Sequence, residues 1–262
     1  MMEYIIVCVV ALGVSGLTLF SGFGLGTVLM PAFALFFPVQ VAVAATAVVH
    51  LANNLFKTAL VGRKADWSVV AKFALPGAAA AVLGAILLTL FASLPPVTSY
   101  RLGGKTHEIA LVKMVVGLLI IGFAFLDLLP RFENLAFDRK YLPIGGLLSG
   151  FFGGLSGIQG ALRSAFLIKI GLEKESFIGT GTVAAVIVDV ARLLVYGLSF
   201  YTIKFAPVSP DMSALVVAST LAAFAGSFIG TRLMKKVTLR TIQIIVGVML
   251  IVVGVGMASG LF

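Results

Sequence analysis

Eight stretches of the chain are almost continuously apolar, and short polar segments separate them. They cover residues 4–37, 39–61, 69–94, 109–129, 142–170, 176–202, 213–234 and 241–262. About 20 apolar residues are enough for a helix to cross a bilayer, so six of these stretches predict one spanning helix each. Strands of a transmembrane barrel would alternate apolar and polar residues instead. The pattern therefore predicts an all-α integral membrane protein.

The stretches at 4–37 and 142–170 are longer than one crossing needs, and glycine interrupts both. The first contains SGLTLFSGFGLGTVLMP at 15–31, and the second contains SGFFGGLSGIQGALRSAFL at 149–167. Glycine lowers helix propensity by about 1 kcal/mol relative to alanine, and glycine clusters permit a tight turn. We expect each stretch to form two shorter helices joined by a turn. The alternative is that these glycines only allow close helix packing, as small residues do in membrane bundles.

Similar short motifs recur at a nearly constant spacing along the chain. Ser-Gly at 15–16 is repeated at 149–150, Ala-Thr at 45–46 matches Gly-Thr at 179–180, and KMVVG at 113–117 resembles QIIVG at 243–247. The chain is therefore predicted to contain two transmembrane repeats, residues 1–130 and 142–262. A polar cytoplasmic linker, residues 131–141, is expected to join them.

The distribution of basic residues between the loops depends on how the glycine-interrupted stretches are counted. If each returns to its own side as a hairpin, one side receives eleven lysines and arginines and the other receives three, Arg101, Lys105 and Lys204. If each stretch crosses once, the division is eight against six. Cytoplasmic loops carry the excess of basic residues. The sequence thus favours two inverted repeats, each a broken hairpin plus three spanning helices, with both termini outside.

Composition agrees with a membrane protein and narrows its chemistry. The chain is 60% hydrophobic and 11% charged, whereas a soluble domain carries about 25% charged residues. The net charge of +9 lies mostly in the short loops, so it does not indicate nucleic-acid binding. Cys8 is the single cysteine, which excludes an internal disulfide and a cysteine cluster. The N-terminal stretch lacks the features of a cleaved signal and is interpreted as the first helix.

Two basic residues lie inside apolar stretches, at matching places in the two halves. Lys57 follows Asn54 by three residues, and Arg192 follows Asp189 by three, so each pair shares a helix face. A charge at membrane depth costs roughly 2.5–3.5 kcal/mol on insertion scales, and two charges in register therefore suggest a buried anion site. In the alternatives, Lys57 extends to the cytoplasmic interface, and Asp189 and Arg192 form an ion pair that only neutralises both charges.

Helix N-termini at the glycine breaks provide further candidate ligands. Such ends carry free N–H groups and a partial positive charge, which makes them suited to anions. The substrate-binding residues expected at the breaks are Gly24, Gly26, Gly157 and Gly160. Arg163 follows the second break and has a guanidinium that can bind an oxyanion through two nitrogens; the alternative is an anchor at the cytoplasmic end.

Polar residues on the same helices complete the predicted site. Asn53, Asn54 and Gln159 are expected to supply neutral hydrogen bonds to the substrate. His50 and Asp189 are the candidates for proton coupling, because a histidine titrates near neutrality; the alternative is that His50 only forms a hydrogen bond inside the bundle. No nucleophile–base set, phosphate loop or paired-cysteine motif is present. We therefore expect no catalytic residue, no cofactor and no metal.

These residues and their order resemble the TauE/SafE sulfite exporter family, also called the TSUP anion permeases. The resemblance rests on GxGxGxxxxP at 22–31, Ala-Thr at 45–46, and the run at 149–167 followed by Thr180, Asp189 and Arg192. It covers essentially the whole chain and implies export or uptake of sulfite, sulfonates or thiosulfate. The thiosulfate transport of relatives implies a relay of several cysteines, whereas this chain has Cys8 alone.

We therefore expect a secondary transporter of small sulfur-containing oxyanions in the bacterial inner membrane, and not an enzyme. Its partners would be the anion, the lipid bilayer and protons as a coupling ion. An anion channel and a carrier of non-sulfur organic anions are the alternatives. A channel needs a continuous wet path, and no ring of charges that would line one is present in the sequence, so a carrier is preferred.

Overall fold

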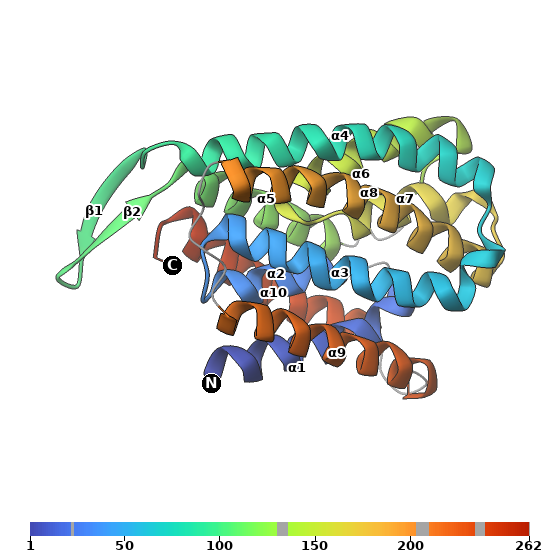
Figure 1. Cartoon of the computed structure of the whole chain (residues 1–262), viewed down its shortest axis with the longest axis horizontal. Helices are drawn as coiled ribbons and strands as arrows, with labels where there is room; N and C mark the ends of the chain where they lie inside the picture. The colour runs from blue at the N-terminus through green and yellow to red at the C-terminus, as the bar shows by residue number, and fades with distance from the viewer. Residues whose placement is uncertain (22–23, 130–135, 203–209, 234–238, 262) are drawn as a thin grey trace.

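The computed structural model describes residues 1–21, 24–129, 136–202, 210–233 and 239–261, and it is a bundle of helices with one small hairpin (Figure 1). The α-helices are α1 (Met2–Ser21), α2 (Leu25–Ala34), α3 (Val39–Val61), α4 (Trp67–Ser93), α5 (Leu111–Leu128), α6 (Leu142–Ser156), α7 (Gly160–Leu167), α8 (Lys174–Thr202), α9 (Pro210–Leu233) and α10 (Leu239–Ala258). Short 3-10 helices are η1 (Gly62–Lys64), η3 (Arg139–Tyr141) and η4 (Ile168–Ile170).

The described residues of all eight predicted apolar stretches are mainly helical, and four described segments are long and apolar enough to cross a membrane. These segments are Val39–Lys64, Trp67–Ser93, Lys174–Ser199 and Asp211–Gly230. Shorter apolar segments lie in α1, α2, α5 and α10. The prediction of a helical membrane protein agrees with this arrangement.

Both glycine-interrupted stretches are broken into two helices, as predicted. The first break separates α1 from α2, and residues 22–23 of its glycine motif lie outside the described residues. The second break begins at Gly157, which ends α6 with a φ of 81°. This left-handed conformation is open to glycine at little steric cost and is a frequent helix stop.

The segment between α4 and α5 departs from the all-α prediction. Strands β1 (Thr98–Leu102) and β2 (Lys105–Ile109) pair antiparallel, and Leu102 lies opposite Lys105. Gly103 and Gly104 form the two-residue turn with φ values of 59° and 78°, as a tight hairpin turn requires. The Gly-Gly pair is a hairpin signal that the search for apolar stretches passed over.

Helices α1–α5 pack against α6–α10, and two of these contacts match each other. Helix α4 packs along α6, and α9 packs along α1, while α3 packs on α8 and α5 on α10. Glycine allows the close approach in both halves. A Cβ atom on Gly150 would collide with the Gly77 carbonyl oxygen, and one on Gly16 would lie 3.0 Å from the Gly226 carbonyl oxygen. Small residues therefore do pack helices together here, in addition to marking the breaks.

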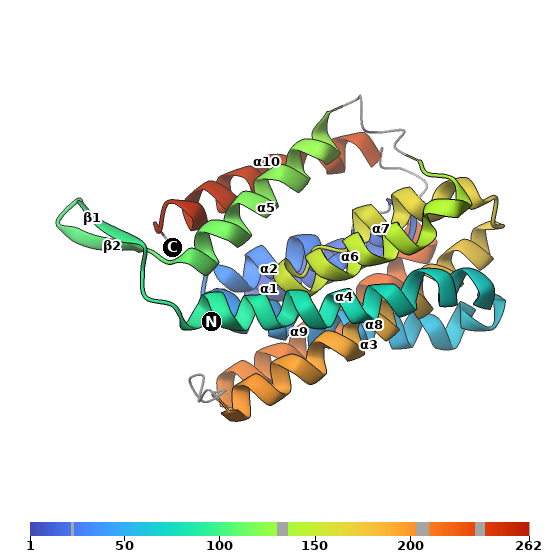
Figure 2. The ribbon, with the colours of Figure 1, turned by 90° about the horizontal axis from the view of Figure 1, so that it is seen from above.

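The ends of the bundle differ in what they carry. Figures 1 and 2 both place the two chain termini and the hairpin at one end, and the α3–α4 connection at the opposite end. Ion pairs tie the connections together at that opposite end: Lys64 with Glu175, Lys169 with Asp138 at 2.7 Å, and Arg139 with Asp66 at 3.8 Å. Loops far apart in the sequence thus meet on one side.

Candidate functional site

The two helix breaks lie against each other inside the bundle. Gly24 precedes α2, and a Cβ atom there would lie 3.2 Å from the Cα and 3.3 Å from the backbone nitrogen of Gly160, the first residue of α7. A Cβ atom on Gly26 would lie 2.6 Å from the carbonyl oxygen of Gly157. The four glycines predicted from the sequence therefore meet, and they bring the N-terminal ends of α2 and α7 together.

Polar side chains from α3 and α8 surround these breaks. Spacings of three and four residues place one face of α3 inward, and its buried side chains are Thr46, His50, Asn53, Asn54 and Lys57. From α8, Asp189 and Arg192 are completely buried. Gln159, at the second break, is 2% exposed. The structure thus gathers the predicted site residues in one region.

Asp189 is the hub of this region, because four donors or potential donors converge on its carboxylate. Its Oδ1 accepts hydrogen bonds from Arg192 Nε at 3.0 Å, Arg192 Nη2 at 2.7 Å and Gln159 Nε2 at 2.8 Å. Its Oδ2 lies 2.6 Å from His50 Nδ1. The predicted Asp189–Arg192 ion pair is therefore present, and both His50 and Gln159 are committed to it.

Arg192 also holds the end of α6 in place. Its Nη1 donates to the Gly153 carbonyl oxygen at 2.8 Å, and Tyr196 donates its hydroxyl to the carbonyl oxygen of Gly154. Ser149 Oγ donates to the Gln159 carbonyl oxygen at 3.0 Å. Carbonyl groups at a helix end need such partners inside a membrane. Sequence reasoning missed Tyr196 and Ser149, although Tyr196 lies one turn beyond Arg192 on the same face.

Lys57 has no such partners. Its residue is 7% exposed, and no hydrogen bond or ion pair reaches its ammonium group from the described part of the chain. Asn54 shares a helix face with Lys57 but donates from Nδ2 to the His50 carbonyl oxygen at 2.9 Å. The first half therefore lacks the ion pair that the second half has.

Arg163 is a second cation without a hydrogen-bonded partner among the described residues. Its Nη1 is buried and makes no hydrogen bond, and its Nε lies close to where a Cβ of Gly181 would be, at 3.8 Å. A Cβ atom on Gly179 would lie 2.6 Å from the carbonyl oxygen of Val61, one turn beyond Lys57, so both cations lie beside the same part of α8. Two positive charges of the same region thus remain without a carboxylate of their own.

Further polar groups in this region also lack a protein partner. Asn53 accepts a hydrogen bond from Ser227 Oγ at 2.8 Å, but its Nδ2 makes none. The hydroxyl groups of Thr27 and Thr46 are likewise buried without a partner. Nearly all buried polar groups in proteins are hydrogen-bonded to protein or water, so unpaired donors beside unpaired cations indicate a place for a polar ligand.

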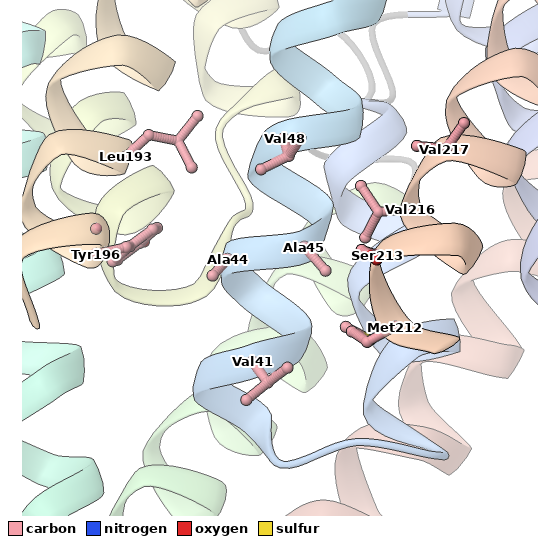
Figure 3. A pocket seen from close by; sticks show the side chains of 11 residues that line it. Val41, Ala44, Ala45, Val48, Leu193, Tyr196, Met212, Ser213, Val216 and Val217 are labelled. Carbon is pink, nitrogen blue, oxygen red and sulfur yellow. The ribbon is translucent and has the colours of Figure 1, made fainter. Parts of the chain in front are cut away.

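A cavity of about 400 Å³ lies elsewhere, between α3, α8 and α9 (Figure 3). Its walls are mostly aliphatic and include Ala44, Ala45, Leu193 and Val216, and neither Lys57 nor Arg163 lines it. The hydroxyl of Tyr196, which borders this cavity, is directed to the Gly154 carbonyl oxygen. The cavity therefore suits apolar groups and is not the place where an anion would bind. No cluster of metal-ligating side chains occurs in the described ranges either.

The chain matches the family model for the sulfite exporter TauE/SafE over residues 5–257. It belongs to this family. Neither a curated protein nor a solved structure matches the chain. TauE/SafE membership confirms the family resemblance and makes the protein a multi-pass membrane transporter. The unpaired cations at its helix breaks are where this TauE/SafE chain could hold a small anion.

Proposed function

We propose that this TauE/SafE protein is a secondary transporter of small sulfur-containing oxyanions, such as sulfite, sulfonates or thiosulfate, across the bacterial inner membrane. The observation that supports this best is the pair of cations Lys57, on the inward face of α3, and Arg163, in α7, whose side chains form no hydrogen bond or ion pair with a carboxylate of the described residues. An unpaired charge in a low-dielectric region is costly, and a bound anion would remove that cost. The N-terminal end of α7 adds a favourable dipole.

In this proposal the site residues divide into two groups. Lys57, Arg163, Asn53 and the backbone N–H groups beside Gly24 and Gly160 contact the anion. Asp189, Arg192, Gln159, Asn54 and His50 hold the helix break and α3 in the required geometry, because their polar groups are already bonded to one another. Gly26 and Gly157 allow the two breaks to approach.

Proteoliposomes loaded with sulfite can test whether the proposed anion-binding residues are needed for transport. The wild type should exchange internal sulfite for external labelled sulfite, and Lys57→Gln with Arg163→Gln should abolish the exchange while the melting temperature is maintained. Arg63→Gln removes an exposed cation near the end of α3 and is the matched control. Exchange by the double variant at the wild-type rate would show that these cations do not bind substrate. Wild-type vesicles that exchange no sulfur oxyanion would overturn the proposed function itself.

We also propose that residues 1–130 and 142–262 are inverted repeats with both termini outside. The equivalent contacts of α4 with α6 and of α9 with α1 support the repeat. The end that carries Arg63, Lys64, Arg139, Lys140, Lys169 and Lys174 is then cytoplasmic, because cytoplasmic loops are rich in lysine and arginine. In a Cys8→Ala background, Ser99→Cys should react with a membrane-impermeant thiol reagent on whole cells, and Glu173→Cys should not. The opposite labelling pattern would reverse the proposed orientation.

Proton coupling is the finer part of the proposal, and the His50–Asp189 contact supports it. A buried imidazole 2.6 Å from a carboxylate oxygen can share or exchange a proton with it. Vesicles that contain a pH-sensitive dye should show proton movement driven by sulfite in the wild type. His50→Gln keeps a hydrogen-bonding side chain but cannot titrate, so it should transport sulfite without moving protons. Undiminished proton movement in His50→Gln would exclude this role for His50.

A further inference from the structure

We infer that the anion site of this chain selects divalent oxyanions over monovalent ones, by holding the anion between Lys57 of the first half and Arg163 of the second. This inference rests on the transport function proposed above and adds the charge of the substrate to it. Its basis is the sum of the charges in the region and the hydrogen bonds that each charge already makes.

The negative charge available in the protein is already used. Asp189 is the one buried carboxylate among the described residues, and its oxygens accept from Arg192 and Gln159 and contact His50. Asp189 and Arg192 are in direct contact, so their opposite charges cancel. Neither carboxylate oxygen forms a hydrogen bond with Lys57 or Arg163.

The charge that remains is that of two cations. Lys57 and Arg163 each carry one positive charge, and both lie beside the N-terminal part of α8. A Cβ atom on Gly181 would lie 3.8 Å from Arg163 Nε, and one on Gly179 would lie 2.6 Å from the carbonyl oxygen of Val61, one turn beyond Lys57 on α3. A bound dianion would neutralise both cations at once, whereas a monoanion would leave one positive charge uncompensated. An uncompensated charge inside the bundle costs free energy, so the dianion should be the more tightly bound.

The free polar atoms of the region favour the same kind of ligand. Lysine and arginine side chains only donate hydrogen bonds. The amide oxygen of Asn53 is occupied by Ser227, so Asn53 also has only its Nδ2 to offer. These groups are complementary to an oxyanion with several unprotonated oxygens. The unpaired hydroxyls of Thr27 and Thr46 can donate as well, so donors predominate in the region.

The test compares sulfate with methanesulfonate, which share a tetrahedral sulfur atom but carry two charges and one charge. Affinities are measured by competition with labelled sulfite on the purified protein. Sulfate should bind the wild type at least about tenfold more tightly than methanesulfonate. Lys57→Gln and Arg163→Gln should each lower the affinity for sulfate by about tenfold and the affinity for methanesulfonate by less than about threefold. Lys57→Arg keeps the charge and should keep the preference, as should the control Arg63→Gln.

The outcomes separate this inference from the proposed function. Equal affinities of the wild type for sulfate and methanesulfonate would overturn the selection by charge. The proposed transport function would be unaffected as long as the wild type binds sulfite. Equal losses of affinity for the two anions in Lys57→Gln would also overturn the inference. The lysine would then contribute to binding without distinguishing a dianion from a monoanion. Failure of the wild type to bind sulfite, sulfate and methanesulfonate would instead overturn the proposed function together with this inference.

Discussion

Helices α3 and α8 cross the interior at matching places in the two halves, but their buried cations have opposite environments. Arg192 of α8 donates three hydrogen bonds, two to Asp189 and one to the Gly153 carbonyl oxygen. Lys57 of α3 makes none with the described residues. Arg192 is therefore held by protein partners, whereas the Lys57 ammonium group has none among the described residues.

A single difference three residues earlier accounts for this divergence. Asp189 provides a charge that fixes Arg192, whereas the neutral Asn54 turns to the backbone of its own helix at His50. Two similar elements can thus serve different purposes once one of them loses its counter-ion. The role of a cation at a repeated position therefore depends on its partners. Position alone would predict the same role for Lys57 and Arg192.

The largest effect is expected from removing the counter-ion of α8. Asp189→Asn should lower the free energy of unfolding by about 3–5 kcal/mol, because a buried pair loses one charge and the other stays uncompensated. Asn54→Ala, at the matching position of α3, removes only neutral contacts with His50 and should cost about 1 kcal/mol. Equilibrium unfolding of the purified protein in detergent micelles measures both changes.

A second substitution controls for the charge itself. Asp189→Asn combined with Arg192→Gln removes both charges and should recover part of the lost stability, because no isolated charge remains. Equal destabilisation by Asp189→Asn and Asn54→Ala would mean that the two halves do not differ in the way the hydrogen bonds indicate.

A smaller effect is expected from giving α3 the pattern of α8. Asn54→Asp places a carboxylate one turn before Lys57, where it can pair with the ammonium as Asp189 does with Arg192. Sulfite at a hundred times its dissociation constant stabilises a binding protein by about 2.7 kcal/mol, and this stabilisation should be lost. Thermal unfolding with and without sulfite measures it. Full stabilisation in Asn54→Asp would show that Lys57 does not need to be free.

Much of this architecture could be predicted from the sequence, because helices in a membrane require long apolar stretches. The two breaks were also predictable, since glycine clusters interrupt apolar stretches that are too long for one crossing. The hairpin was missed because its strands are short and polar, and only Gly103 and Gly104 mark its turn. Periodicity alone does not detect such a short element.

The site was predictable as a set of residues but not as a set of contacts. The sequence places Lys57, Asn54, Asp189 and Arg192 on inward helix faces, which the burial of all four confirms. It does not tell that His50 lies beside Asp189, because this contact joins residues 139 positions apart. Partners of that kind follow from the packing of α3 on α8. The lack of hydrogen-bonding partners around Lys57 among the described residues could therefore be recognised only from the structure.

The glycines of the two breaks extend the comparison and should give an intermediate effect. Gly157 has a φ of 81°, so Gly157→Ala should destabilise the fold by about 1–3 kcal/mol through backbone strain. Gly24 has a φ of −79°, and Gly24→Ala should leave the backbone unstrained. Its methyl group would instead lie 3.3 Å from the Gly160 nitrogen and weaken sulfite binding. Thermal unfolding and sulfite binding, measured on both variants, distinguish these effects, and strong destabilisation by Gly24→Ala would contradict them.

The smallest effect is expected at two threonines that occupy matching places on α3 and α8. Thr180 Oγ1 accepts a hydrogen bond from the backbone N–H of Asp66 at 2.9 Å, whereas the Thr46 hydroxyl is buried without a partner. Valine has nearly the same shape as threonine, so Thr180→Val should cost about 1 kcal/mol by leaving that N–H unpaired. Thr46→Val should cost nothing, because it removes only an unpaired hydroxyl. A loss of stability in Thr46→Val equal to that in Thr180→Val would show that Thr46 has a partner after all. Slower sulfite exchange by Thr46→Val at unchanged stability would mean instead that the Thr46 hydroxyl forms a hydrogen bond during transport.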